Sequence, residues 1–208
     1  DIKLIVKQYP DFPEASLWLS YAAMHFYGPE TLLLEYEKFE KSGIKASSRE
    51  LIASGAVLFK SRKYIRSIEK LSQALDLAPN DPVALYWRGL ANLGLKNRKE
   101  AIADFSLMLK AKHNDFHFAG YLNRGEAYLQ ENLLKEALSD YLNAQKIAPD
   151  SAEAVTAVAN ALMSLNRLEE AEERAKKATE LDPKSDRPFI ILAMINDMKG
   201  NCEAAKKL

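Results

Sequence analysis

The sequence predicts an all-α protein built from stacked helical hairpins. Three observations support this fold class: a repeat of about 34 residues, two amphipathic segments in each repeat, and a helix-ending residue after the second segment. Small residues mark the first segment of each repeat at spacings of 34, 36, 34 and 34, namely Gly55, Gly89, Gly125, Ala159 and Ala193. A period of this size is typical of solenoids, in which each repeat packs against its neighbours.

The second segment of each repeat carries its own small residue at the same spacings: Ser67, Ala101, Ala137, Ala171 and Ala205. Apolar residues recur at intervals of three and four in both segments, as in LYWRGLANLGL and AIADFSLML, which indicates amphipathic helices. Small residues on both helices allow the two backbones to approach closely. The repeats close at Pro79, His113, Pro149 and Pro183, and proline cannot continue a helix.

The elements follow in chain order. The stretches PEASLWLSYAAMHFYG and PETLLLEYEKFEKSG resemble a degenerate hairpin, with Ser20 and Leu32 where the later repeats have small residues. Turn and cap residues precede two of the later first helices, at Asn80-Asp81 and Asp150-Ser151. The predicted helices are 13–27, 30–42, 48–61, 63–77, 82–95, 98–111, 117–131, 133–147, 152–165, 168–181 and 186–199. Two extra residues, Phe116 and His117, should lengthen the next helix or bulge the loop.

One repeat carries a complete family pattern of aromatic, small, aromatic, alanine, aromatic, alanine and proline: Tyr121, Gly125, Tyr128, Ala137, Tyr141, Ala144 and Pro149. This pattern resembles the tetratricopeptide repeat. The repeat before it departs from the pattern at Asn92, Met108 and His113. The resemblance implies a right-handed α-α superhelix. We expect residues 1–47 to hold the end of a helix and the degenerate hairpin, and 48–208 to hold the array, with repeats 48–81, 82–115, 118–151, 152–185 and an incomplete 186–208.

The composition disfavours several classes of function. Lysine plus arginine equals aspartate plus glutamate at 29 each, so no net positive charge attracts nucleic acid. No apolar run approaches the length of a membrane span, so no direct membrane insertion is expected. Cys202 is the only cysteine, which excludes an internal disulfide and favours the cytoplasm.

No group of residues suggests catalysis, a cofactor or a metal. The histidines are His25, His113 and His117, and the last two do not share one helical face because His113 follows a helix. Cys202 has no histidine near it in sequence to act as a base, and no glycine-rich phosphate loop is present. We therefore expect no enzymatic activity.

Two arginines precede repeat glycines, and two aspartates follow repeat alanines by three residues: Arg88, Arg124, Asp104 and Asp140. They could bind a ligand, or each arginine could pair with the aspartate of its own hairpin. The sequence favours the internal pairs, which would fix the helix register.

The resemblance implies that the first helices line a concave groove for a partner. The groove residues so assigned are Trp18, Tyr21, Phe59, Tyr86, Trp87, Leu90, Leu93, Asn123, Glu126 and Asn160. Inward positions on other first helices, such as Ile52, Ile190, Ile191 and Met194, fit either a groove or the core. Acidic residues at Glu126 and Glu153 argue against RNA on this face.

The function expected is a non-catalytic interaction module or scaffold that binds a partner peptide or helix. The alternative is a regulatory or targeting portion of a larger enzyme or membrane-associated complex. Self-association stays open.

Overall fold

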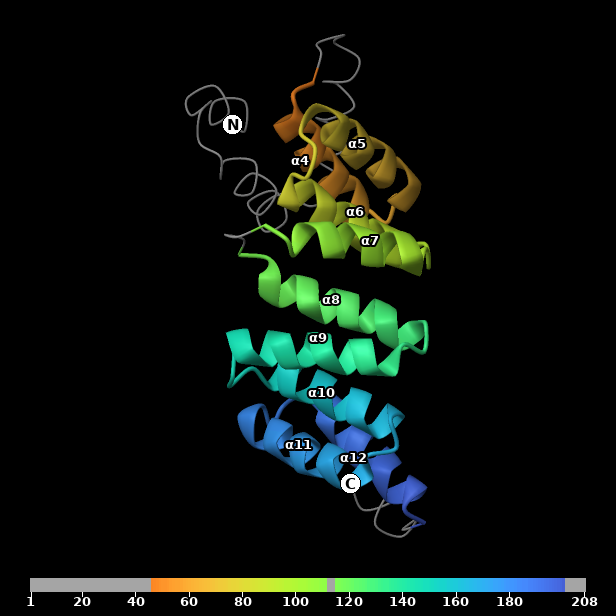
Figure 1. Ribbon diagram of the computed structural model, residues 1–208, viewed down its shortest axis with the longest axis vertical. Helices are drawn as coiled ribbons and strands as arrows, with labels where there is room; N and C mark the ends of the chain where they lie inside the picture. Colours follow the sequence, from red (N-terminus) through yellow and green to blue (C-terminus); the bar gives the residue numbers. More distant parts are fainter. Residues whose placement is uncertain (1–45, 112–114, 201–208) are drawn as a thin grey trace. The chain divides into compact units, whose positions relative to one another are not determined.

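A computed structural model describes residues 46–111 and 115–200. These residues form α-helices joined by short turns, with no strand among them, so the all-α prediction is confirmed. The chain divides into two compact units, Asp1–Asn114 and Asp115–Leu208, which we call the N-terminal and the C-terminal unit. Within each unit the helices are layered one after another (Figure 1).

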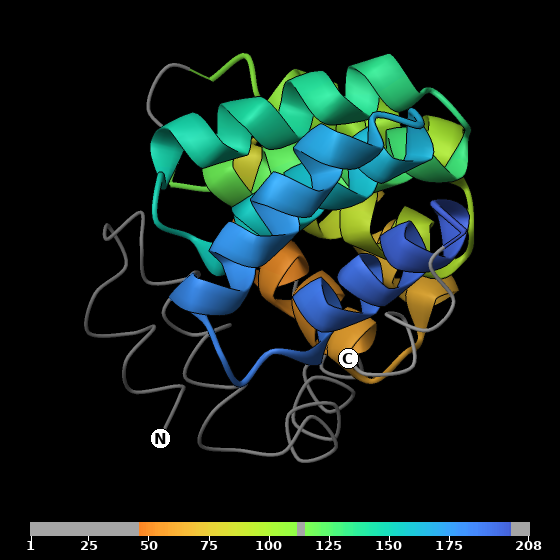
Figure 2. The same cartoon turned by 90° about the horizontal axis from the view of Figure 1, so that it is seen from below.

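Among the described residues, the N-terminal unit contains two hairpins, and the C-terminal unit contains two hairpins and one further helix. The helices are α4 (Ser48–Lys60), α5 (Tyr64–Leu77), α6 (Pro82–Gly94), α7 (Arg98–Met108), α8 (His117–Gln130), α9 (Leu134–Ile147), α10 (Ala152–Ser164), α11 (Leu168–Leu181) and α12 (Asp186–Met198). In the C-terminal unit α12 packs beside α11 and α10, and Figure 2 shows this end of the unit from below.

The helices predicted between residues 48 and 199 are all present, and all but one agree with the prediction to within one residue at each end. The exception is α7, which ends at Met108 and not at residue 111. The chain tightens there, because the N–H groups of Lys110 and Ala111 bond to carbonyls three residues back, at 3.1 and 3.2 Å.

The two extra residues lengthen the helix that follows them. α8 begins at His117, one residue earlier than the other first helices of the array, and Phe116 is its N-cap. The degenerate hairpin predicted over 13–27 and 30–42 lies outside the described residues. The domain boundary placed at residue 47 stays a prediction.

Three of the described first helices, α4, α6 and α10, begin at side-chain caps. Ser47 and Glu50 form a reciprocal capping box, in which Ser47 N–H donates to Glu50 Oε2 at 2.7 Å. Asp81 Oδ1 accepts from the N–H groups of Val83 and Ala84 at 2.9 and 3.0 Å. The cap chemistry predicted at Asp81 is therefore confirmed, and it satisfies backbone donors that the helix leaves unpaired.

The turn inside each hairpin repeats as faithfully as the helices do. One residue per turn has a left-handed backbone, with φ between 57° and 64°, at Arg62, Lys96, Asn132 and Asn166. The next N–H bonds back five residues, as from Lys63 to the carbonyl of Leu58 at 2.8 Å, which closes a Schellman motif. Arginine and lysine are unusual in this conformation, so the sequence did not reveal the motif.

The two helices of each hairpin meet at a pair of residues sixteen apart. A glycine on the first helix lies under a large side chain on the second in Gly55–Leu71, Gly89–Phe105 and Gly125–Tyr141. A Cβ atom at Gly125 would lie 2.6 Å from Tyr141 Cε1, closer than van der Waals contact allows. The next hairpin has Ala159 and Ala175 at these positions, both fully buried. The size of one residue of the pair therefore compensates for the size of the other, so that the space between the two helices stays filled.

This compensation predicts that the effect of Gly125→Ala on stability depends on the residue at position 141. Gly125→Ala should lower the free energy of unfolding by about 1 kcal/mol or more, because overpacking against Tyr141 outweighs the better helix propensity of alanine. In a Tyr141→Ala background the same change should stabilise, by up to about 1 kcal/mol, because the ring is gone. Urea unfolding followed by circular dichroism measures both, and an equal loss in the two backgrounds would show that the close approach is not the cause.

Candidate protein-binding surface

Four of the predicted groove residues, Phe59, Tyr86, Trp87 and Leu90, come together on α4 and α6 of the N-terminal unit. The rings of Phe59 and Tyr86 each lie 5.6 Å from the Trp87 ring, centroid to centroid, in tilted and edge-on geometries that aromatic pairs prefer. Leu90 packs on the same apolar cluster. Lys60 Nζ lies 5.9 Å from the centre of the Trp87 ring.

The exposure of these side chains distinguishes a buried core residue from residues that face the outside. Trp87 is only 7% exposed and belongs to the core with Ile52 and Leu71, so it does not serve as an open anchor. The other predicted hydrophobic groove residues of α4 and α6, namely Phe59, Tyr86, Leu90 and Leu93, are half-buried. They present part of each side chain to the outside, and Trp87 packs beneath Phe59 and Tyr86 in the cluster that Leu90 also contacts.

The predicted polar residues lie in the C-terminal unit. Glu126 is exposed on α8, where its carboxylate accepts from Gln130 Nε2 at 2.7 Å and from the Tyr141 hydroxyl at 3.3 Å. Burial raises the pKa of Tyr141, and the charge of Glu126 and its hydrogen bond raise it further, so the phenol stays protonated and donates. Asn123 donates to the Ala119 carbonyl of its own helix at 2.7 Å.

The remaining predicted residues fall elsewhere. Asn160 is half-buried on α10 of the C-terminal unit. Trp18 and Tyr21 lie outside the described residues. Of the positions left between groove and core, Ile52 and Ile191 are buried, whereas Ile190 and Met194 are exposed.

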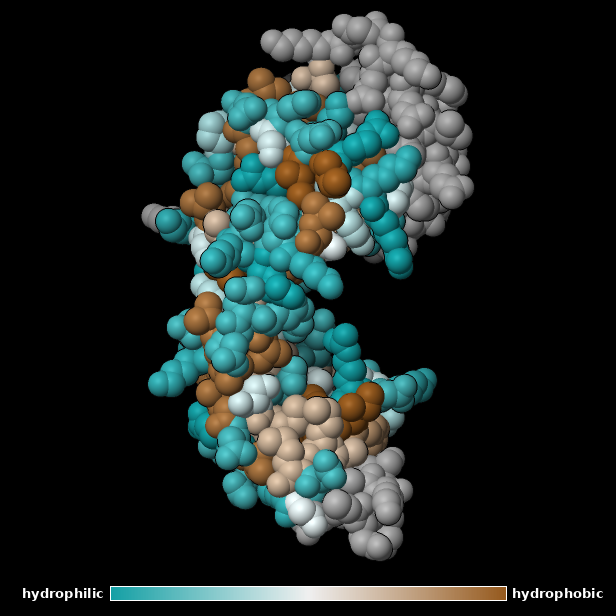
Figure 3. Space-filling view, turned by 90° about the vertical axis from the view of Figure 1, so that its right-hand side faces the viewer, coloured by the Kyte–Doolittle hydropathy of each residue, from teal (hydrophilic) through white to brown (hydrophobic). Residues whose placement is uncertain are grey.

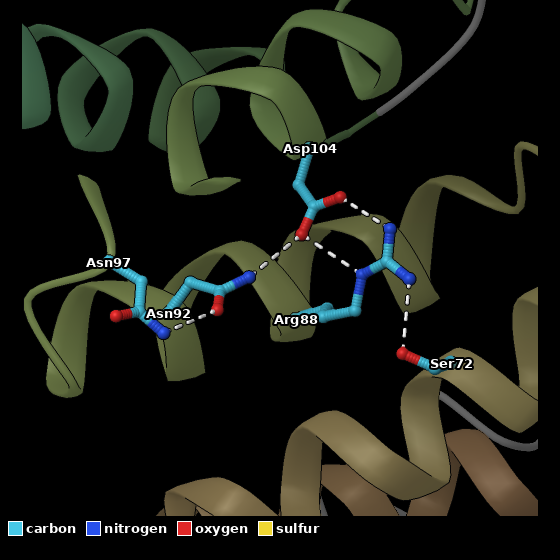
Figure 4. Close-up of polar contacts among 5 residues, drawn as sticks. All are labelled: Ser72, Arg88, Asn92, Asn97 and Asp104. Carbon is cyan, nitrogen blue, oxygen red and sulfur yellow. Dashed lines mark hydrogen bonds and ion pairs between the residues drawn. The ribbon is translucent and has the colours of Figure 1, made fainter. Parts of the chain in front are cut away.

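The first predicted ion pair forms within its hairpin. Arg88 Nη2 and Nε donate to the two oxygens of Asp104 at 2.6 and 3.0 Å, a bidentate pair. Asn92 Nδ2 also donates to Asp104, at 3.2 Å, and Arg88 Nη1 donates to Ser72 of the preceding hairpin at 3.1 Å. Figure 4 shows this network joining α5, α6 and α7. The structural interpretation of Arg88 is confirmed.

The second predicted pair repeats the first in the C-terminal unit. Arg124 donates through Nε and Nη2 to Asp140 at 2.7 and 2.8 Å, and its guanidinium lies 5.9 and 5.6 Å from the rings of Tyr121 and Tyr128. Burial opposes the charge of Arg124, but the hydrogen bond and attraction from Asp140 outweigh it and raise the pKa. Both arginines therefore have internal partners that fix the helix register.

Sequence reasoning missed the role of Asn92. It stood out only as a departure from the aromatic that the repeat pattern expects at that position, yet it is 5% exposed and donates to the buried Asp104. A polar residue in an apolar position was the available signal, because buried amides need partners.

No group of metal-binding side chains occurs among residues 46–111 and 115–200. His117, the one histidine within that part of the chain, packs near the Tyr121 ring at 6.4 Å. None of the helices described is long and apolar enough to span a membrane.

Comparison with known families identifies the repeat. Models described as tetratricopeptide repeat match residues 53–116 and 128–195, which together make up more than half of the chain. The chain belongs to the tetratricopeptide-repeat family. Membership of this family makes it a protein-interaction scaffold.

Relatives of this tetratricopeptide-repeat protein agree in fold. The chain is 33% identical over 101 residues to dynein axonemal assembly factor 4 of Rattus norvegicus, an alignment covering 46% of this chain and 24% of that protein, about a quarter of its length. Residues 41 to the end of MamA from Desulfovibrio magneticus RS-1 superpose with a TM-score of 0.70 at 24% identity, covering 77% of this chain and 89% of that one. YrrB, described as a TPR protein with an unusual peptide-binding site, gives 0.64 at 22% identity, covering 76% and 80%.

Proposed function

We propose that this tetratricopeptide-repeat chain is a non-catalytic scaffold of the cytoplasm that binds a peptide or helix of a partner protein on its first helices. The half-buried apolar surface of α4 and α6, formed by Phe59, Tyr86, Leu90 and Leu93, carries the proposal. Aromatic side chains supply large contact area at low entropic cost, because few rotatable bonds are frozen on binding. Trp87 beneath them keeps the surface preformed.

In the C-terminal unit the proposed binding residues are polar and lie on α8 and α10. Asn123, Glu126 and Asn160 would hydrogen-bond the backbone or polar side chains of the partner. Their donors and acceptors would set specificity, since an unmatched polar group is costly to bury on binding.

A variant of the aromatic surface tests the proposal. Tyr86→Ala combined with Leu90→Ala should weaken partner binding at least tenfold while the helical content stays nearly intact, because both side chains are already partly exposed. The partner is first captured on the wild-type chain and then titrated against each variant. Ile65→Ala, which removes a side chain 64% exposed on the second helix α5, is the matched control. Equal affinity of the double variant and the control would place the binding surface elsewhere.

A second candidate function is a regulatory or targeting portion of a larger enzyme or membrane-associated complex. The observation in its favour is that the aligned relative is a longer protein, of which the match spans 24%. The complete coding sequence distinguishes the two, because a catalytic or membrane-spanning domain in the same polypeptide would support the second.

A further inference from the structure

Helix α12 presents an apolar stripe to the outside of the C-terminal unit. Ile190, Met194 and Met198 are 56%, 48% and 51% exposed, and their four-residue spacing places them on one face of the helix. Two turns of helix, roughly 12 Å, separate the first from the last. On the side of the molecule shown in Figure 3, apolar side chains gather into a continuous area on the lower half, which is made by α8–α12.

Two equivalent positions elsewhere in the array are covered by the first helix of the next repeat. Ile52 takes the place of Ile190 in α4 and is 2% exposed, because α6 packs over it with Ala84. Thr156 takes that place in α10 and is 8% exposed where α12 packs against α10. The stripe on α12 therefore has the shape of a face that receives a helix, and its three apolar side chains suit an amphipathic one.

The charges on α12 and on the first helices that precede it indicate the chemistry of that helix. α8, α10 and α12 contact one another in succession and form one layer of first helices. This layer carries four acidic residues, Glu126, Glu153, Asp186 and Asp197, against two arginines. One arginine, Arg124, is held by Asp140, and lysines are confined to the second helices α9 and α11 and to the turns among the described residues of this unit. The layer is therefore acidic, and complementary charge favours a basic partner.

We propose that the layer formed by α8, α10 and α12 binds a basic amphipathic helix of a partner protein. The apolar side chains of that helix pack on Ile190, Met194 and Met198. Its lysines or arginines lie toward the exposed carboxylates of Glu126 and Glu153. Gln130 and the Tyr141 hydroxyl hold the Glu126 carboxylate in place, which reduces the cost of ordering it on binding. This inference rests on the proposed scaffold function and specifies the partner of the C-terminal unit.

The test uses two synthetic peptides and the full 208-residue chain. Each peptide has roughly 16 residues, enough for a marginal helix in isolation, with leucine on one face. One carries lysine on the other face, and its twin carries glutamate. Fluorescence anisotropy at low salt should show the lysine peptide binding at least tenfold more tightly than its twin, and added salt should weaken it.

Matched variants then distinguish binding at the layer of α8, α10 and α12 from nonspecific electrostatic attraction to the chain. Glu126→Gln with Glu153→Gln should lower the affinity for the lysine peptide about tenfold, and Met194→Ser should lower it similarly. Glu169→Gln with Glu173→Gln removes the same charge from exposed positions on α11 and should have no effect. Equal affinity for the twins, no binding of either, or an equal loss in the α11 control would each overturn the inference.

Failure here is distinguishable from failure of the proposed function. If both peptides fail while Tyr86→Ala with Leu90→Ala still abolishes capture of a partner, the scaffold function stands and the assignment of a basic helix to α12 is wrong. If the lysine peptide binds as expected and the aromatic double variant has no effect on capture, the assignment of a basic helix to α12 stands. The proposal that α4 and α6 bind the partner is then wrong.

Discussion

Trp87→Ala should lower the free energy of unfolding by about 3–5 kcal/mol, the range found when buried large aromatic residues are truncated to alanine. Trp87 is 7% exposed, its ring packs against those of Phe59 and Tyr86, and it lies in the same apolar cluster as Leu71. Its removal leaves a cavity between α4 and α6. Chemical denaturation followed by far-ultraviolet circular dichroism measures the loss.

The control for Trp87→Ala is Ile65→Ala in the same unit, which should change the free energy of unfolding by less than about 0.5 kcal/mol because Ile65 is 64% exposed. Partner binding should fall only as far as the folded population falls. A Trp87→Ala protein of normal stability with a large loss of affinity would instead assign Trp87 to the contact surface.

Asp140→Ala should cost about 3 kcal/mol, because it leaves the Arg124 guanidinium partly buried without its bidentate partner. Asp140 is 4% exposed as a side chain and Arg124 18%, which places the effect toward the lower end of the range for buried ion pairs. Replacing both residues, as Arg124→Met with Asp140→Leu, should recover most of the loss because no charge is then stranded. Thermal and urea unfolding of the three variants measure this.

An exposed pair in the same unit is the comparison for Asp140. Arg167 and Glu170 pair at 2.6 Å but are 47% and 54% exposed, so Glu170→Ala should have no measurable effect on stability. If the double replacement of Arg124 and Asp140 were as destabilising as Asp140→Ala alone, the stranded charge would not be the cause.

The periodic features of the fold were predictable from the sequence because they depend on local pattern. The spacing of Gly55, Gly89 and Gly125 located the hairpins, and the helix ends followed to within a residue except at α7. The pairing of Arg88 with Asp104 was predictable for the same reason, since antiparallel helices place residues sixteen apart opposite each other.

The candidate surface was harder to predict because it depends on what covers each first helix. Ile52, Thr156 and Ile190 occupy one repeat position, yet the first two are buried by a following helix and the third is exposed. Trp87 shows the same limit, since a tryptophan at an inward position fits both an open groove and the core. A family pattern assigns a direction to a side chain, whereas exposure depends on its neighbours.

The matched sizes of the facing residues limit how helices from different repeats can be combined. Gly125 fits under Tyr141, whereas Ala159 fits with Ala175. A chimaera that joins α8 to α11 would set a glycine opposite an alanine and leave a void, and one that joins α10 to α9 would force a methyl group into a ring. Hairpins can therefore be duplicated or transplanted only as intact pairs of helices, because the two facing residues of each hairpin fit only each other.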